Sequence, residues 1–208
     1  MNITEMINDV IESEINSIVE VKKNVDPSYE QAVEKIANCK GKVIFLGLGK
    51  SGHIGKKLAA TFASTGTPSF FVHATEAVHG DLGMISKKDI VIAISNSGET
   101  KEVLSTLPSI KLIGATLLSI TGNRNSTLAT SSEITIEVQV ESEADQYNLA
   151  PTNSSTVTLV VGDALAVAVS QIKGFKKEDF GLFHPGGSLG KQLLADGHIK
   201  TKKENDKE

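Results

Sequence analysis

Residues 89–100 read DIVIAISNSGET, and the change of character within this stretch decides the fold. Residues 90–94 are all apolar, which is typical of a strand covered on both faces of a parallel sheet. Hydroxyl, amide and carboxylate side chains and one glycine follow at once, from Ser95 to Thr100. In open α/β sheets ligands bind beyond the carboxyl ends of the strands, so this stretch predicts a core strand that ends at a binding site.

The same alternation extends in both directions along the chain. Further strands are predicted at 42–46, 68–72, 115–120 and 134–140. Helices are predicted between and around them, at 3–22, 28–38, 54–64, 99–107, 126–130 and 152–173. Strands that alternate with helices indicate an α/β domain with a parallel sheet and crossover helices. We expect a helical N-terminal extension over 1–40, the domain over 41–195, and a disordered polar tail over 196–208.

Composition narrows the classes of function. The 208 residues carry a net charge of −4, which argues against nucleic acid as a partner. The single cysteine, Cys39, excludes an internal disulfide and fits a reducing cytoplasm. The first residues lack the pattern of a signal peptide, and no continuous apolar run of about 18 residues occurs, so we predict a cytoplasmic protein with no membrane partner.

The loop at 95–100 has the chemistry of a phosphate site. A strand that leads into a helix presents free backbone N–H groups and the positive end of the helix dipole. Ser95, Ser97 and Thr100 add hydroxyl donors, Gly98 allows close approach, and Ser51 before the preceding helix can add another donor. The alternative interpretation is helix capping by Ser97 alone, which requires only one hydroxyl.

A glycine loop, GLGKSGHIG at 47–55, follows the strand at 42–46. It matches G-x-G-x-x-G, the phosphate-binding pattern of dinucleotide folds, but those folds also need an acidic residue at the end of the second strand. The residues there are Phe71, Val72 and His73. The P-loop pattern is absent as well, so the sequence disfavours a nucleotide-dependent oxidoreductase and we expect no cofactor.

Four longer blocks carry a resemblance to a known family. They are GKSGHIGKKLAATFASTGTPSFFVHATEAVHGDLGM (49–84), DIVIAISNSGET (89–100), LAPTNSSTVTLVVGDALAVAV (149–169) and FHPGGSLGKQLL (183–194). The short loop has the S-x-S-G-x-T form of sugar isomerase (SIS) domains. Over about residues 40–195 the chain resembles the D-arabinose 5-phosphate isomerases, in a short form without the pair of CBS domains that many members carry.

The resemblance implies a three-layer αβα sandwich, doubly wound like flavodoxin, around a five-stranded parallel sheet. It implies interconversion of D-ribulose 5-phosphate and D-arabinose 5-phosphate through an enediol, without a metal or organic cofactor. The product of such enzymes feeds the synthesis of 3-deoxy-D-manno-octulosonate for lipopolysaccharide or capsule. It further implies a homotetramer with sites at subunit contacts.

The family's catalytic set falls on Lys50, Glu102, Glu143 and His184. Lys50 suits the stabilisation of an oxyanion or phosphate, and a histidine suits proton handling near neutral pH. Three of them also have a purely structural interpretation. Lys50 could be a surface lysine, Glu102 could lie on a solvated helix face, and His184 could be a capping or surface histidine. The residues alone do not separate Glu143 from Glu141, and they leave open whether Glu102 or Glu143 is the base.

Four further residues are expected to line the substrate site. His73 and His79, with Glu76, could bind a metal, although their spacing matches no strong zinc pattern. The resemblance implies that His79 contacts the substrate. It also implies that a zinc ion bound at His79 inhibits the enzyme and has no catalytic role. It also places Gly66 and Thr67 on the substrate path, where the plain alternative is a turn before the second strand.

Two other functions remain as alternatives. One is a non-catalytic phosphosugar-binding SIS module, as in some transcriptional regulators, although no helix-turn-helix region is recognisable in the sequence. The other is an isomerase for a different phosphosugar, such as a hexulose phosphate. The complete catalytic set favours the arabinose 5-phosphate isomerase.

Overall fold

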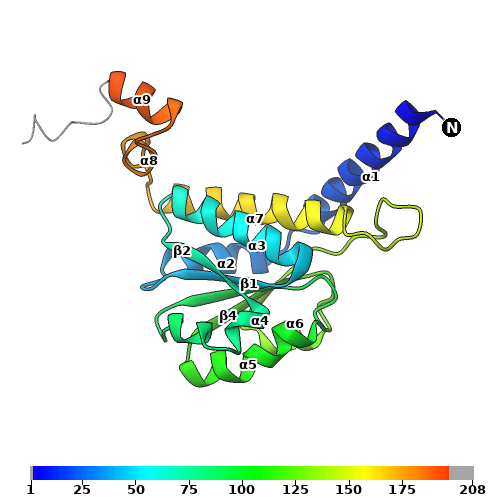
Figure 1. Ribbon diagram of the computed structural model, residues 1–208, viewed down its shortest axis with the longest axis horizontal. Coiled ribbons are helices and arrows are strands. Elements are labelled where there is room, and N and C mark those ends of the chain that lie inside the picture. Colours follow the sequence, from blue (N-terminus) through cyan, green and yellow to red (C-terminus); the bar gives the residue numbers. More distant parts are fainter. Residues whose placement is uncertain (1, 197–208) are drawn as a thin grey trace, which may run out of the picture.

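The computed structural model of the protein describes residues 2–196. Five parallel strands form one sheet in the order β2-β1-β3-β4-β5, which is the flavodoxin-like doubly wound order. The strands are β1 (Val43–Gly47), β2 (Ser69–His73), β3 (Ile90–Ile94), β4 (Thr116–Thr121) and β5 (Ile134–Glu137). The predicted fold, a three-layer αβα sandwich with a five-stranded parallel sheet, is confirmed (Figure 1).

Helices cover both faces of the sheet. On one face lie α1 (Ile3–Lys23), α2 (Pro27–Ala37), α3 (Gly49–Ser64) and α7 (Asn153–Ile172). On the other lie α4 (Ala74–Ala77), the 3-10 helix η1 (Asp81–Met84), α5 (Lys101–Ile113) and α6 (Thr127–Ser131). Two short helices follow at the C-terminal end, α8 (Lys177–Phe183) and α9 (Ser188–Ala195).

The continuous apolar strands are explained by two separate cores. Successive side chains of a strand point to opposite faces, so β1 sends Val43 and Phe45 into the core under α3 and α7, and Ile44 and Leu46 into the core under α5. All five residues of β1 and of β3 are buried. A strand buried on both faces therefore has apolar residues at successive positions and not only at alternate ones.

The long helix α7 is apolar for a structural reason. By length and composition it is the one described helix that could cross a membrane. In the fold it packs against α1, α2 and α3, and Val157, Val161, Leu165 and Val169 are buried in the first core. The central helix of a folded domain meets the same compositional test.

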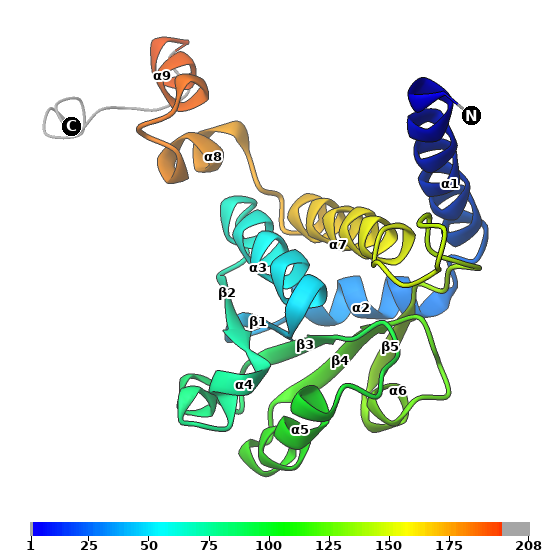
Figure 2. The same ribbon diagram turned by 45° about the vertical axis from the view of Figure 1, so that its right-hand side comes forward.

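The N-terminal segment divides into two parts. Ala32 and Ile36 of α2 are fully buried in the core, whereas the first half of α1 is exposed and stands clear of the sheet (Figure 2). The predicted tail lies mostly outside the described residues, which end at 196.

Two predicted boundaries were wrong for a common reason. Residues 47–55 were expected to form a loop before a helix at Ile54, but α3 begins at Gly49, and Lys50 and Ser51 lie in its first turn. Similarly, α5 runs on to Ile113 past Pro108. Glycine and proline often end helices, but Gly52 and Gly55 lie within α3 and Pro108 lies within α5. The short helices α8 and α9 were not predicted.

Candidate active site

The loop at the end of β3 curls into a compact turn of hydroxyl groups. Ser95 is 2 % exposed, and its Oγ lies 2.8 Å from the Thr100 Oγ1 and accepts a hydrogen bond from the Gly98 N–H at 3.1 Å. The Ser97 Oγ accepts from the Glu99 N–H at 3.1 Å. The loop is therefore preorganised before any ligand binds.

The start of α5 is open to an anion. Its N-cap is Thr100, not Ser97, and the Thr100 side chain makes no capping hydrogen bond. Backbone N–H groups in the first turn of a helix lack intrahelical partners and carry the positive end of the dipole. Capping by Ser97, the alternative explanation of these hydroxyls, does not occur in the structure.

Gly98 is required by the geometry of the loop. Its φ is +67°, and a Cβ atom there would lie 2.0 Å from the Oγ of Ser126. Ser126 is buried and caps α6 by accepting from the Ala129 N–H. The phosphate-type loop is thus pressed against the beginning of α6, and only glycine fits between them.

A second wall of the site comes from the neighbouring strands. Lys50 and Ser51 follow β1, which pairs with both β3 and β2. His73 ends β2, in register with Gly47, so it lies at the same carboxyl edge of the sheet. His79 is exposed in the turn after α4, and its N–H donates to the Glu76 carbonyl at 2.9 Å.

The two candidate glutamates also lie on this edge, in different environments. Glu102 is exposed in the first turn of α5, two residues after the hydroxyl loop. Glu143 lies in the segment between β5 and α7, and its carboxylate is hydrogen-bonded to the beginning of α7. Glu141 is exposed nearby.

Three of the predicted residues lie at the opposite edge. Gly66 and Thr67 precede β2, and the Nζ of Lys173 beyond the C-terminal end of α7 donates to the Gly66 carbonyl at 3.1 Å and lies 3.3 Å from the Thr67 Oγ1. His184 follows α8, further along the chain. Because α7 has 20 residues, about 30 Å of helix separates this end from the edge that holds Ser95. Figure 1 shows α8 and α9 at the far end of α7 from its beginning.

His184 is held by its own helix. Its Nδ1 lies 2.8 Å from the Phe180 carbonyl, and its ring stacks on the Phe180 ring with centroids 3.9 Å apart. Within one chain the structure therefore places most of the predicted residues at or just beyond the carboxyl edge of the sheet, namely Lys50, Ser51, His73, His79, Ser95, Ser97, Thr100, Glu102 and Glu143. Gly66, Thr67 and His184 do not lie there.

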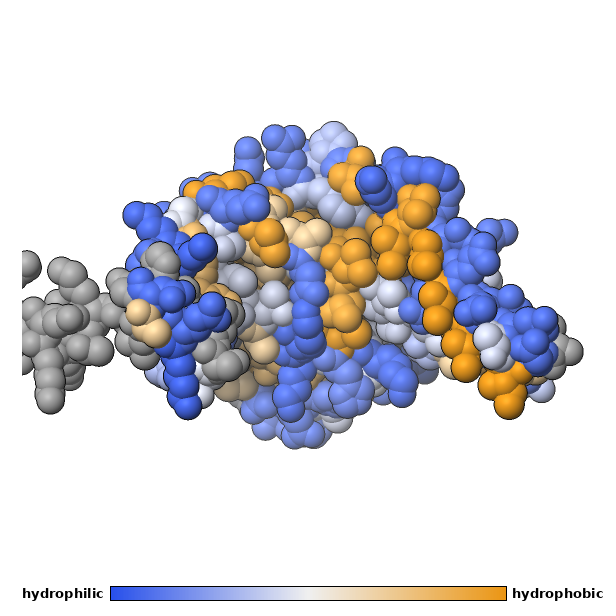
Figure 3. Space-filling model, turned by 90° about the horizontal axis from the view of Figure 1, so that it is seen from above, coloured by the Kyte–Doolittle hydropathy of each residue, from blue (hydrophilic) through white to orange (hydrophobic). Residues whose placement is uncertain are grey.

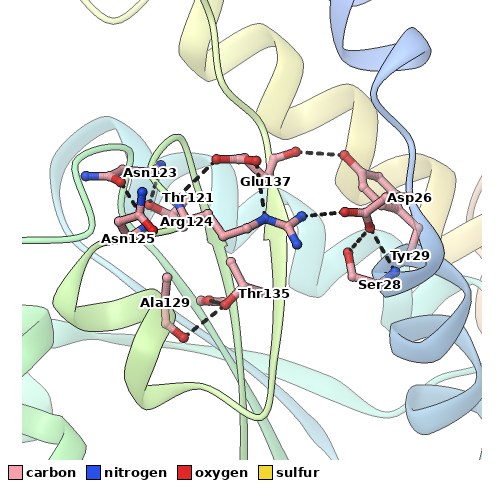
Figure 4. A network of polar contacts seen from close by, with 11 residues as sticks. Asp26, Ser28, Tyr29, Thr121, Asn123, Arg124, Asn125, Ala129, Thr135 and Glu137 are labelled. Atoms are coloured by element: carbon pink, nitrogen blue, oxygen red, sulfur yellow. Dashed lines mark hydrogen bonds and ion pairs between the residues drawn. The ribbon is translucent and has the colours of Figure 1, made fainter.

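A polar network that sequence reasoning missed supports the loop from outside. Arg124 follows β4 and contacts Glu137 of β5 (Nε–Oε2 3.3 Å) and Asp26 before α2 (2.5 Å), as Figure 4 shows. The Tyr29 hydroxyl donates to the Glu137 carbonyl at 2.9 Å, and burial raises the pKa of Tyr29 to about 12. The Ser28 hydroxyl, followed by other hydrogen bonds, lowers the pKa of Asp26. The network fixes residues 122–126, against which Gly98 packs.

Residues 2–196 contain no preformed metal site. No group of three or more histidine, cysteine, aspartate or glutamate side chains in this part of the chain converges to hold an ion. The association of His79 with an inhibitory zinc ion stays a prediction.

Comparison with known proteins gives the family. Residues 35–168 match the SIS domain. The chain is 52 % identical over 186 residues to the arabinose 5-phosphate isomerase KdsD of Shigella flexneri, covering 89 % of this chain and 57 % of that protein. It is 55 % identical over 170 residues to KdsD of Pseudomonas aeruginosa, covering 82 % and 52 %.

A solved structure extends the likeness to the whole of another chain. The structure of E. coli CFT073 c3406 in complex with arabinose 5-phosphate is 54 % identical, with a TM-score of 0.86, and the match covers 89 % of this chain and 100 % of that one. By contrast, the chain spans little more than half the length of the two KdsD relatives. On its domain match and on this structural likeness, the chain belongs to the SIS domain family.

Proposed function

We propose that the protein is an aldose–ketose isomerase that interconverts D-ribulose 5-phosphate and D-arabinose 5-phosphate through an enediol. The observation that carries this proposal is the hydroxyl loop at an uncapped helix start, in a chain 54 % identical to a protein solved with arabinose 5-phosphate. Curated relatives at 52 % and 55 % identity with the same activity in their names support it.

The proposed roles follow from position and chemistry. Ser95, Ser97 and Thr100, with Ser51 and the first N–H groups of α5, bind the phosphate. Lys50 stabilises the oxygen that becomes negative as the enediol forms.

His184 moves protons between the sugar oxygens, and Glu102 or Glu143 takes the proton from carbon. His73 and His79 line the path of the sugar, and Gly66 and Thr67, which lie at the other end of α7, line it from a second copy of the chain. No cofactor takes part in this route.

A site with His184 needs two copies of the chain, because within one chain this histidine lies at the wrong end of α7. We propose a homotetramer with the sites at subunit contacts. An exposed apolar stripe along α1 supports association, together with a groove of about 500 Å³ between α1, α2 and α7. Figure 3 shows this stripe as a continuous apolar band along one side of the molecule.

The setting in the cell follows from the proposed reaction. We propose a soluble cytoplasmic enzyme whose catalytic domain spans 41–195. Its product would supply the synthesis of 3-deoxy-D-manno-octulosonate for lipopolysaccharide or capsule.

An assay of the wild type and of His184→Ala, after treatment with a chelator, tests the function. We expect D-arabinose 5-phosphate to be converted to ribulose 5-phosphate by the wild type, and activity to be lost in the folded variant. A hexulose phosphate offered in parallel tests the other isomerase. A folded, oligomeric wild type that binds phosphosugar without turning over either compound would instead indicate a binding module.

A further inference from the structure

The carboxylate of Glu143 is enclosed by donors at the beginning of α7. Its Oε2 accepts from the backbone N–H groups of Thr152 at 2.8 Å and Ser154 at 3.1 Å, and from the Thr152 hydroxyl at 3.2 Å. Its Oε1 accepts from the Ser154 hydroxyl. Four donors therefore converge on two oxygens, so a proton can reach Oε2 only by displacing one of its three donors, and protonation of either oxygen would weaken bonds that the charged carboxylate accepts.

These hydrogen bonds cap the N-terminal end of α7. Thr152 is the N-cap of α7, but its side chain makes no capping hydrogen bond within the helix. Glu143 instead accepts from the N-cap N–H and from the N–H two residues later, and its negative charge lies at the positive end of a 20-residue helix. A residue nine positions upstream thus supplies the cap.

The segment between Glu143 and Thr152 is folded around these bonds. The Glu143 N–H donates to the Asn148 Oδ1 at 2.7 Å, and the Ala144 N–H donates to the Thr152 Oγ1 at 2.8 Å. Asp145 accepts from the N–H groups of residues 147, 149 and 150. Removing the Glu143 carboxylate would free the start of α7 and the bonds that tie Glu143 to Thr152 across this loop, while the bonds of Asn148 and Asp145 would remain.

Glu102 has the opposite character. It is exposed, and its carboxylate makes no hydrogen bond or ion pair within residues 2–196. It lies two residues beyond Thr100, on the first turn of the helix whose open N-terminus faces the hydroxyl loop. A carboxylate without partners can accept a proton at no cost in broken bonds.

We propose that Glu102 takes the carbon-bound proton and that Glu143 is a positioning residue, which caps α7 and fixes the loop at 143–152. The assignment rests on the proposed function. In the aldose-to-ketose direction the Glu102 carboxylate removes the proton from C2, the C–H electron pair forms the C1–C2 double bond, and the carbonyl electrons move to O1, which takes a proton from protonated His184. The O2 hydroxyl then gives its proton to the neutral His184 as the C2 carbonyl forms, and protonated Glu102 returns its proton to C1, so both residues end in their starting states.

Substitution by glutamine separates the two roles. Glutamine cannot act as the base, but its carbonyl oxygen can still accept from the two N–H groups of α7. We expect Glu102→Gln to lower kcat about 100-fold or more without changing the melting temperature, since a lost general base costs about that much. We expect Glu143→Gln to lower kcat by no more than about tenfold, in contrast to a lost base.

Stability gives the complementary readout. We expect Glu143→Ala to lower the melting temperature by about 1–8 °C, as loss of a helix cap does in a domain of this size, and Glu143→Gln to restore most of it. Glu141→Gln, an exposed carboxylate in the same segment, is the matched control and is expected to change neither property.

Exchange of the C2 hydrogen of D-arabinose 5-phosphate with deuterated solvent reports the base directly. Glu102→Gln should lose this exchange while still binding the phosphosugar, and Glu143→Gln should keep it. A Glu143→Gln protein with an unchanged melting temperature that loses exchange, beside an active Glu102→Gln, would overturn the assignment.

A wild type without activity would overturn the proposed function and with it the role of Glu102. The cap would then be judged from melting temperatures alone. Equal melting temperatures for Glu143→Ala and the wild type would refute the cap even if the enzyme is active.

Discussion

Replacement of Gly98 by alanine tests whether the hydroxyl loop is held by close packing. A Cβ at this position would lie 2.0 Å from the Ser126 Oγ, 2.4 Å from the Ser126 Cβ and 3.0 Å from the Thr121 Oγ1. Ser126 is 1 % exposed and caps α6, so it has no free space into which to move. The loop itself must therefore shift.

The magnitude has two parts. A left-handed backbone costs an alanine about 1–2 kcal/mol, and forcing a methyl group into a packed interior costs about 1–3 kcal/mol. Their sum, about 2–5 kcal/mol, corresponds to a melting temperature lower by about 4–20 °C in a chain of this length.

Gly114→Ala is the matched control. Gly114 has φ +81° at the end of α5, but the nearest atom to an added Cβ is the Lys87 Cβ at 3.8 Å. Only the backbone part applies, which predicts a decrease of about 2–8 °C.

Thermal unfolding followed by circular dichroism compares the two variants, and initial rates give KM for D-arabinose 5-phosphate. We expect Gly98→Ala to unfold at a lower temperature than Gly114→Ala and to show a raised KM, because the hydroxyl donors are displaced. Equal melting temperatures would refute the packing argument. An unchanged KM in Gly98→Ala would refute the assignment of the loop to the phosphate.

Three further predictions concern single groups. Ser95→Ala should raise KM for the phosphosugar by about tenfold, through loss of a buried donor, in initial-rate measurements. Asp89→Ala should lower the free energy of unfolding by about 2–4 kcal/mol in urea titrations, because the buried Asp89 carboxylate accepts from the N–H groups of Lys42 and Ser86, each at 2.7 Å. The pKa of Tyr29 is raised to about 12, so the stability that its neutral hydroxyl contributes is complete below pH 10 and is lost as the pH rises toward 12. In denaturant titrations across this range, the free energy of unfolding of Tyr29→Phe should therefore fall less than that of the wild type.

The sheet was predictable because its signal is local. Five apolar runs with polar ends gave five strands, each within a few residues of its observed bounds, and parallel pairing follows from the helices between them. The hydroxyl loop was predictable for the same reason, since Ser95, Ser97 and Thr100 directly follow an apolar strand.

The arrangement of the site depended on contacts that no local pattern encodes. Which edge of the sheet receives His184 depends on the direction of α7 and on where the chain leaves it, as the Lys173–Gly66 contact shows. The cap of α7 comes from Glu143, nine residues before the N-cap, and the usual search for a cap looks at the adjacent residue.

Complementation between two inactive variants tests the central claim, that isomerisation occurs at a site built by two copies. His184→Ala and Glu102→Gln are produced together with different tags, and complexes that carry both tags are isolated. Each heteromeric pair then contains one intact site, so we expect about a quarter or more of wild-type conversion of D-arabinose 5-phosphate. Mixed complexes as inactive as either variant alone, beside an active wild type, would contradict the shared site.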